Sequence, residues 1–298
     1  MNNRRVIRAL SALVAVSMAF AAVQGQPAAP PAKQPSVKSP AEGQALQAIF
    51  RAVDAETRIK AATDFMVKFA DSDFKALALL AAADAYQNSN DYANMVIFAE
   101  RALEADPAYY MAMLMLARGI AQHTREHDLD REEKLGRVEK YANGAIELVK
   151  TASKPNPQMS DEQWTQAKAI FNSQAHEALG IAAAVRKNYD LAITEYKTAV
   201  ELSKPPDPAT QVRLGAAYNQ AKRYDEAIAI LDQVMAAPDV HPQVRSIAQA
   251  ERARAIQAKG GPAKPPAPAT PPAPAATPAP ATPPAPAAAP APTEPKKP

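Results

Sequence analysis

The stretches that decide the fold are residues 188–200, NYDLAITEYKTAV, and residues 223–231, RYDEAIAIL. Each places a tyrosine just before a run in which alanines recur at helical spacing. Tyr189 and Tyr224 are 35 residues apart. A third segment, residues 90–103, NDYANMVIFAERAL, repeats the pattern earlier in the chain. A period near 34 residues predicts helix pairs that stack as repeated units, because each unit buries its apolar face against the next.

The pattern resembles that of the tetratricopeptide repeat, in which Leu-Gly, Tyr, Ala, an aromatic residue, Ala and Pro recur in order. Gly180 and Gly215 are again 35 residues apart, and a small residue there lets two helices approach closely. The resemblance implies an all-α fold, an α-α superhelix or solenoid of about four to five helical pairs and a terminal helix. The predicted repeat-packing residues are Tyr86, Tyr92, Ala102, Pro107, Leu179, Gly180, Tyr189, Ala192, Tyr196, Ala199, Leu214, Gly215, Tyr218, Tyr224 and Ala227.

The repeats are unevenly spaced, since Tyr92 and Tyr189 are 97 residues apart. We place one irregular pair between them, with a charged insertion of roughly nine residues between its helices. Ser160 and Gln163 form a capping-box pattern that predicts the start of a long helix. The expected helices outside the clear repeats cover residues 42–53, 55–69, 110–122, 137–150, 161–186 and 242–259.

The N-terminal residues follow the order of regions that is typical of an export signal. Basic residues up to Arg8 precede an apolar run of 15 residues, Ala9–Val23, which is short for a membrane span. We therefore predict a signal peptide of residues 1–25, with an uncleaved signal anchor as the alternative. The chain has no cysteine, which excludes a lipidated N-terminal cysteine. The predicted location is the bacterial periplasm or the medium outside the cell.

Proline divides the remaining chain. Residues 26–41 form a proline-rich linker, residues 42–260 the repeat domain, and residues 261–298 a tail that holds 16 of the 29 prolines. The Ala-Pro alternation of the tail cannot bury a core and favours an extended, disordered segment. Such a tail could act as a spacer, dock a partner or reach the cell wall.

Charge argues against a nucleic-acid partner. The formal charge of +3 comes from three arginines of the predicted signal peptide, and its removal leaves equal numbers of basic and acidic residues. No basic stripe with interleaved aromatic residues is present.

The sequence also contains no phosphate-binding glycine loop, cysteine nucleophile or Gly-x-Ser-x-Gly motif. The sequence therefore predicts no cofactor, no nucleic-acid partner and no enzymatic activity.

One short sequence motif suggests a different function. His123, Glu126 and His127 fit His-x-x-Glu-His, a zinc motif of inverted metallopeptidases, and two histidines four residues apart can share a helix face. A metal-dependent hydrolase is accordingly the alternative function. The string lies in the charged insertion, however, and we interpret it as a solvated segment beside a helix. The acidic residues Asp128, Asp130, Glu132 and Glu133 lack the glycine of a calcium loop. Because Arg131 and Lys134 lie among them, we interpret this run as a mixed-charge surface.

We therefore predict that the protein is an exported scaffold or adaptor of the cell envelope. It would bind a protein or peptide in the concave groove of its solenoid. The family's chaperone-binding members hold a peptide carboxylate with Lys, Asn and Arg, and here only Arg118 is basic among the equivalent positions. Met111 is assigned to the groove, and the nearby Met113 and Met115 to the core. The predicted groove residues are Asp84, Gln87, Asn88, Met111, Leu114, Arg118, Gln122, Gln174, Glu177, Asn219 and Gln220.

Overall fold

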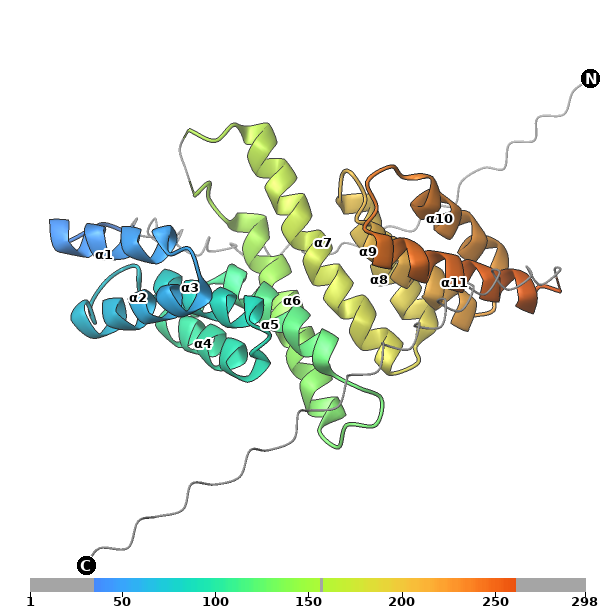
Figure 1. Ribbon diagram of the computed structural model, residues 1–298, viewed down its shortest axis with the longest axis horizontal. Helices are drawn as coiled ribbons and strands as arrows, with labels where there is room; N and C mark the ends of the chain where they lie inside the picture. Colours follow the sequence, from blue (N-terminus) through green and yellow to red (C-terminus); the bar gives the residue numbers. More distant parts are fainter. Residues whose placement is uncertain (1–34, 156–157, 261–298) are drawn as a thin grey trace, which may run out of the picture. The chain divides into compact units, whose positions relative to one another are not determined.

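A computed structural model describes residues 35–155 and 158–260 of the chain, which form eleven helices and no strand (Figure 1). This confirms the all-α fold class. The helices are α1 (Pro40–Arg51), α2 (Ala55–Lys68), α3 (Lys75–Asn88), α4 (Tyr92–Ala105), α5 (Tyr110–His123), α6 (Arg131–Thr151), α7 (Asp161–Val185), α8 (Tyr189–Leu202), α9 (Pro208–Gln220), α10 (Tyr224–Ala236) and α11 (Pro242–Ala258).

The chain divides into two compact units between Ala178 and Leu179, a point that lies within α7. In the first unit, each helix from α1 to α5 packs on the next, and α1 also contacts α3. In the second unit, α8 packs on α9, α9 on α10 and α10 on α11, and α9 also contacts α11. Helices packed in consecutive pairs are what the 34-residue period predicts.

Small residues hold the helix pairs close together. Ala192, Ala199 and Ala227 are fully buried. A side chain at Gly180 would meet the ring of Tyr196, because a Cβ atom there would lie 2.5 Å from Cε1. At Gly215 a Cβ atom would lie 2.7 Å from both Cγ and Cδ2 of Leu231. The glycines of the repeat pattern are therefore needed for space rather than for backbone conformation.

The predicted packing residues have different exposures. Ala102, Tyr196, Leu214 and Tyr218 are buried with the three alanines, and the ring of Tyr86 lies 5.0 Å from that of Phe98. The side chains of Tyr86, Tyr92, Leu179, Tyr189 and Tyr224 are half-buried, and Pro107 is exposed.

Three turns between paired helices share one backbone conformation. Asn90, Lys187 and Lys222 have φ values of 57°, 60° and 59°. In each turn the next N–H donates to a carbonyl five residues back, as from Asp91 to Tyr86 at 2.9 Å. This is the Schellman arrangement, which usually uses glycine at the left-handed position. Here asparagine and lysine take that place.

The irregular pair differs from its prediction in one respect. Helix α6 begins at Arg131, six residues before the predicted start at Arg137. Glu132 and Glu133 lie in its first turn, where carboxylates interact favourably with the helix dipole. Part of the charged insertion is therefore helical rather than a loop.

The capping box at Ser160 is confirmed. The Gln163 N–H donates to Ser160 Oγ at 3.1 Å, and the Ser160 N–H donates to Gln163 Oε1 at 3.0 Å. These reciprocal bonds satisfy two donors that the first turn of α7 would otherwise leave open.

Replacing Ser160 by alanine is expected to destabilise the start of α7 by about 1 kcal/mol, because an N-cap acceptor is lost. Amide hydrogen exchange of residues 161–165 should measure the change. The exposed Ser246 lies within α11, so Ser246→Ala is a matched control that removes a serine without removing a cap. Equal exchange in both variants would contradict the role of Ser160.

The segment before α1 is attached to the turn between α2 and α3 through Glu42. This glutamate is 1% exposed. It accepts hydrogen bonds from the Lys38 N–H and from Ser72 Oγ, both at 2.5 Å. Lys38 in turn pairs with Asp73 at 3.4 Å. The bond from Ser72, followed by that from the Lys38 N–H, lowers the pKa of Glu42 below its ordinary value of 4.5.

This lowered pKa predicts an acid-dependent contribution to stability. The charged form of Glu42 stabilises the fold above pH 4.5, and the contribution is lost as the pH falls through the lower folded pKa. Glu42→Gln should therefore melt at a lower temperature than the unchanged chain at pH 7, and the difference should shrink below pH 4.5. Thermal unfolding by circular dichroism across this range tests it. A difference independent of pH would show that the charge of Glu42 has no part.

Several predictions concern residues outside the described ranges. The signal peptide of residues 1–25, most of the linker of residues 26–41 and the tail of residues 261–298 belong to this group. These boundaries stay predictions. Within residues 35–155 and 158–260, no helix combines the length and apolar character that crossing a bilayer requires.

Candidate functional site

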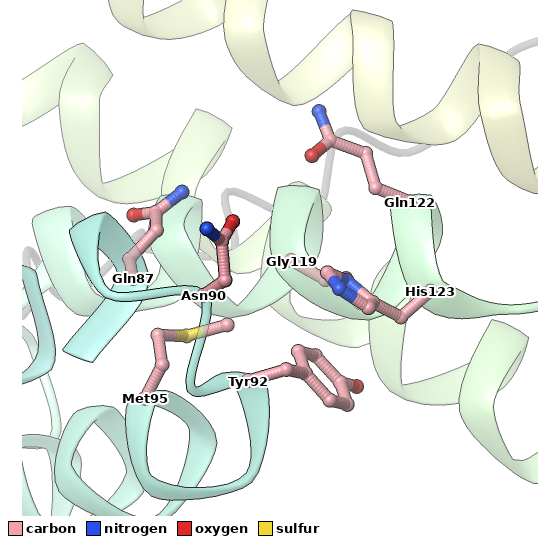
Figure 2. A pocket seen from close by; sticks show the side chains of 7 residues that line it. All are labelled: Gln87, Asn90, Tyr92, Met95, Gly119, Gln122 and His123. Atoms are coloured by element: carbon pink, nitrogen blue, oxygen red, sulfur yellow. The ribbon is translucent and has the colours of Figure 1, made fainter. Parts of the chain in front are cut away.

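A pocket of about 220 Å³ opens in the first unit, where α3 ends, α4 begins and α5 ends (Figure 2). We call it the amide pocket, because three of its side chains are carboxamides. Figure 2 shows these carboxamides on one side and the rings of Tyr92 and His123 on the other. The lining residues are Gln87, Asn90, Tyr92, Met95, Gly119, Gln122 and His123.

The turn between α3 and α4 positions one of the carboxamides. Asn90 takes the left-handed conformation, which asparagine tolerates better than most residues, and its N–H donates to the Gln87 carbonyl at 3.0 Å. Asp91 then caps α4 by accepting from the Asn94 N–H at 3.1 Å. The backbone of Asn90 is thus held from both sides at the pocket rim.

The carboxamides of Gln87, Asn90 and Gln122 make no hydrogen bond within residues 35–155 and 158–260. A carboxamide offers two N–H donors and one carbonyl acceptor. Three of them around one pocket can satisfy both polar groups of another molecule's peptide bond. Hydrogen bonding to a peptide backbone is therefore the main chemical interaction that the site can offer.

His123 and Tyr92 form the ring wall of the pocket. Their ring centroids lie 4.0 Å apart with an interplanar angle of 14°. His123 Nδ1 lies 2.9 Å from the Gly119 carbonyl, and since a carbonyl only accepts, Nδ1 carries the proton and donates. Burial raises the pKa of Tyr92 above its ordinary value of 10.0, so its phenol stays protonated at neutral pH.

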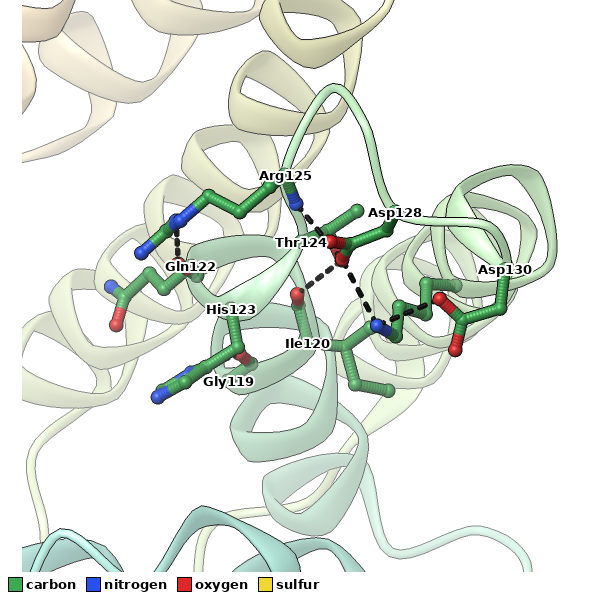
Figure 3. A network of polar contacts seen from close by, with 9 residues as sticks. Gly119, Ile120, Gln122, His123, Thr124, Arg125, Asp128 and Asp130 are labelled. Atoms are coloured by element: carbon green, nitrogen blue, oxygen red, sulfur yellow. Dashed lines mark hydrogen bonds and ion pairs between the residues drawn. The ribbon is translucent and has the colours of Figure 1, made fainter.

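The segment after His123 is tied down by its own polar contacts (Figure 3). Thr124 Oγ1 donates to the Ile120 carbonyl at 2.7 Å, and the Arg125 N–H donates to Asp128 Oδ2 at 3.1 Å. Lys134 Nζ pairs with Asp128 at 3.0 Å and with Asp130 at 2.9 Å. The acidic run is therefore a mixed-charge cluster, as the sequence indicated. These contacts fix the end of α5 and with it the place of His123.

Among the described residues, His123, Glu126 and His127 do not form a group that could hold a metal ion. His123 is the last residue of α5 and lines the amide pocket, whereas Glu126 and His127 are exposed in the following turn and do not. Within the part of the chain that the structure describes, no three histidine, aspartate or glutamate side chains are placed to share an ion.

The predicted groove residues are brought together only in small sets. Gln87 and Gln122 line the amide pocket. Asp84 pairs with Arg58 at 3.2 Å and accepts from Asn88 Nδ2 at 3.3 Å. Arg118 Nε lies 3.5 Å from Glu177 Oε2.

The other predicted groove residues differ in their exposure to solvent. Leu114, Glu177 and Asn219 are 3%, 6% and 7% exposed. Asn219 Nδ2 donates to the carbonyl and to Oε2 of Glu251, both at 2.9 Å. Met111 is 37% exposed, Gln220 is exposed and Gln174 is half-buried. The groove as a whole stays a prediction.

Sequence reasoning missed Asn90, Met95 and Gly119 as members of a site. Met95 stands where the repeat pattern usually has alanine, and it is 2% exposed. Its Cε occupies the space that a side chain at Gly119 would need. The sequence signal that could have identified this contact was Met95 in place of the usual alanine, together with Gly119 on the next helix.

Comparisons with known proteins agree with this arrangement of helices. Two tetratricopeptide repeat family models match the chain, one at residues 76–109 and one at residues 186–259. The first covers α3 and α4, and the second covers α8 to α11. A comparison with curated protein sequences gives no match.

Among solved structures, TTC0263, a thermophilic TPR protein of Thermus thermophilus, is 15% identical. The match covers 71% of this chain and 95% of that chain, with a TM-score of 0.47. The MamA protein is 17% identical over 63% of this chain and 84% of its own, with a TM-score of 0.38. The assembly chaperone of RpL4, Acl4, is 13% identical over 74% of this chain and 98% of its own, also with a TM-score of 0.38.

The family assignment rests on the two model matches together with the helix pairs that they cover. Both matches fall on segments in which helices of similar length pack in consecutive pairs around buried alanines. Residues 76–109 and 186–259 of this chain are therefore tetratricopeptide repeats.

Proposed function

We propose that this protein is an exported, non-enzymatic scaffold of the bacterial cell envelope that binds extended segments of other proteins. Tetratricopeptide repeats support a role in protein–protein interaction. The N-terminal order of basic residues and a short apolar run supports export. Envelope location and a concave binding groove are parts of the proposal.

The observation that carries the binding role is the set of three carboxamides around the amide pocket that have no hydrogen-bond partner among the described residues. An extended peptide presents N–H and C=O groups along its backbone, and carboxamides can bond both. The ring wall of Tyr92 and His123 adds an apolar surface beside them. No observation in the described ranges favours the metal-dependent hydrolase.

Partner capture with and without the pocket amides tests the binding role. The full chain, cross-linked in its host cells, should retain a defined set of proteins that the double variant Gln87→Ala, Gln122→Ala loses. Gln47 is an exposed glutamine of α1, outside the pocket, so Gln47→Ala is the matched control. Capture that survives in the double variant would place partner binding elsewhere.

Export needs a separate experiment. Cell fractionation should recover the protein outside the cytoplasm, and its N-terminal residue should lie near residue 26. A chain that keeps Met1 and pellets with membranes would support the signal-anchor alternative instead.

A further inference from the structure

The described residues that line the amide pocket include no carboxylate, ammonium or guanidinium group. Its polar groups are the three carboxamides, the Tyr92 hydroxyl and the His123 imidazole, and Met95 and Gly119 complete the lining. A charged ligand segment would lose hydration in this pocket without gaining an ionic partner. The pocket is therefore suited to an uncharged segment.

Proline-rich segments need the groups that this pocket offers. A polyproline II chain makes no internal hydrogen bonds, so its carbonyls need outside donors, and proline itself has no N–H to donate. The NH₂ groups of Gln87, Asn90 and Gln122 are such donors, and Tyr92 and His123 offer a ring surface for proline side chains. Grooves that bind proline-rich ligands elsewhere combine aromatic walls with hydrogen-bond donors in this way.

The chain itself supplies a segment of matching chemistry. Residues 265–293 are 29 consecutive uncharged residues, all of them proline, alanine or threonine. The sequence Pro-Pro-Ala-Pro-Ala occurs three times within them, at residues 265–269, 271–275 and 283–287. In a polyproline II conformation these 29 residues would span roughly 90 Å at about 3.1 Å per residue. Their start lies seven residues after the end of α11 at Ala258.

A pocket in the second unit suits this segment less well. It has a volume of about 280 Å³, and the side chains of Lys197, Glu201 and Glu226 contribute to its lining. An uncharged segment laid across these groups would remove water from them and offer no opposite charge in return. Charge therefore favours the amide pocket.

We propose that the amide pocket binds residues 265–293 of a second copy of this chain. The proposal rests on the binding role of the pocket proposed above and names one ligand for it. Each chain has one amide pocket and three Pro-Pro-Ala-Pro-Ala copies, so a tail has motifs left for the pockets of other molecules. A tail bound in the pocket of another molecule is a heterologous contact, which links molecules into closed rings or open chains according to its geometry.

Sedimentation velocity over a range of protein concentration tests the assembly. The average sedimentation coefficient of the full chain should rise with concentration, and a variant that ends at Gly260 should stay monomeric. The double variant Gln87→Ala, Gln122→Ala with an intact tail should associate at least about tenfold more weakly, because each lost hydrogen bond weakens binding several-fold. Gln47→Ala should associate like the unchanged chain.

A synthetic peptide of residues 265–293 provides the second arm. Added to the full chain, it should dissociate the assemblies, and a peptide of equal length with serine in place of every proline should not. A full chain that is monomeric at every concentration, association that persists in the double variant, or equal competition by the serine peptide would each overturn the proposal. A tail that cross-links only to its own molecule would overturn it as well.

The outcome can be separated from that of the proposed function. Partner capture is repeated with the variant that ends at Gly260, which retains every helix of the described residues. If that variant still captures proteins through the pocket amides while the full chain does not self-associate, only the tail proposal fails. If neither capture nor association depends on those amides, the binding role of the pocket fails with it.

Discussion

Replacing Tyr196 by alanine is expected to lower the free energy of unfolding of the second unit by about 3–5 kcal/mol. Tyr196 is 3% exposed and lies in the core that joins α8 to α9 and α10, with Leu214, Tyr218 and Ala227 in the same cluster. Its ring also fills the space left by Gly180. Removal of the ring leaves a cavity that the rigid helix backbones cannot close.

Urea unfolding, followed by circular dichroism and by hydrogen exchange of α8, would measure this loss. Tyr196→Phe retains the ring and should lose much less. If both variants were equally destabilised, the loss would come from the hydroxyl group rather than from the packing of the ring.

The second large effect is expected at Gly215. Gly215→Ala should destabilise the second unit by about 1–3 kcal/mol, because the added Cβ would lie 2.7 Å from two atoms of the fully buried Leu231. The same exchange at Gly136 is a matched control. A Cβ atom there has no neighbour within 4 Å, so Gly136→Ala should stabilise α6 by about 0.5–1 kcal/mol through helix propensity.

The two alanine variants are thus expected to shift stability in opposite directions. The urea midpoints of unfolding of Gly215→Ala and Gly136→Ala, each compared with that of the unchanged chain, test this expectation. A stabilising effect at Gly215 would mean that α9 and α10 can separate without loss, and that the glycine of the repeat pattern is not required for space.

The sequence predicted the helices because their causes are local. Alanine spacing, the tyrosines at helix starts and the reciprocal side chains of Ser160 and Gln163 each act within one or two turns. The long helix α7 was predicted at 161–186 and is observed as Asp161–Val185. The start of α6 was misplaced because its first turn is polar and lacks the apolar spacing on which the prediction relied.

The amide pocket could not be predicted in the same way. It depends on contacts between residues far apart in sequence, such as the stacking of Tyr92 on His123 and the fit of Met95 against Gly119. The resemblance to the repeat family selected Gln87 and Gln122 for the groove, and both line the pocket. It also selected Leu114 and Asn219, which packing has largely covered.

The left-handed turns at Asn90, Lys187 and Lys222 bear on how the sequence can change over time. A non-glycine residue in this conformation costs about 1–2 kcal/mol, whereas glycine would have more freedom to lose when the chain folds. The two costs partly cancel, so the identity of the turn residue has a small net effect. The turns are instead determined by the helices that they join. Lys187 and Lys222 should therefore tolerate many substitutions, while the glycines and alanines between the helices stay fixed. Asn90 should vary less, because its carboxamide also lines the amide pocket.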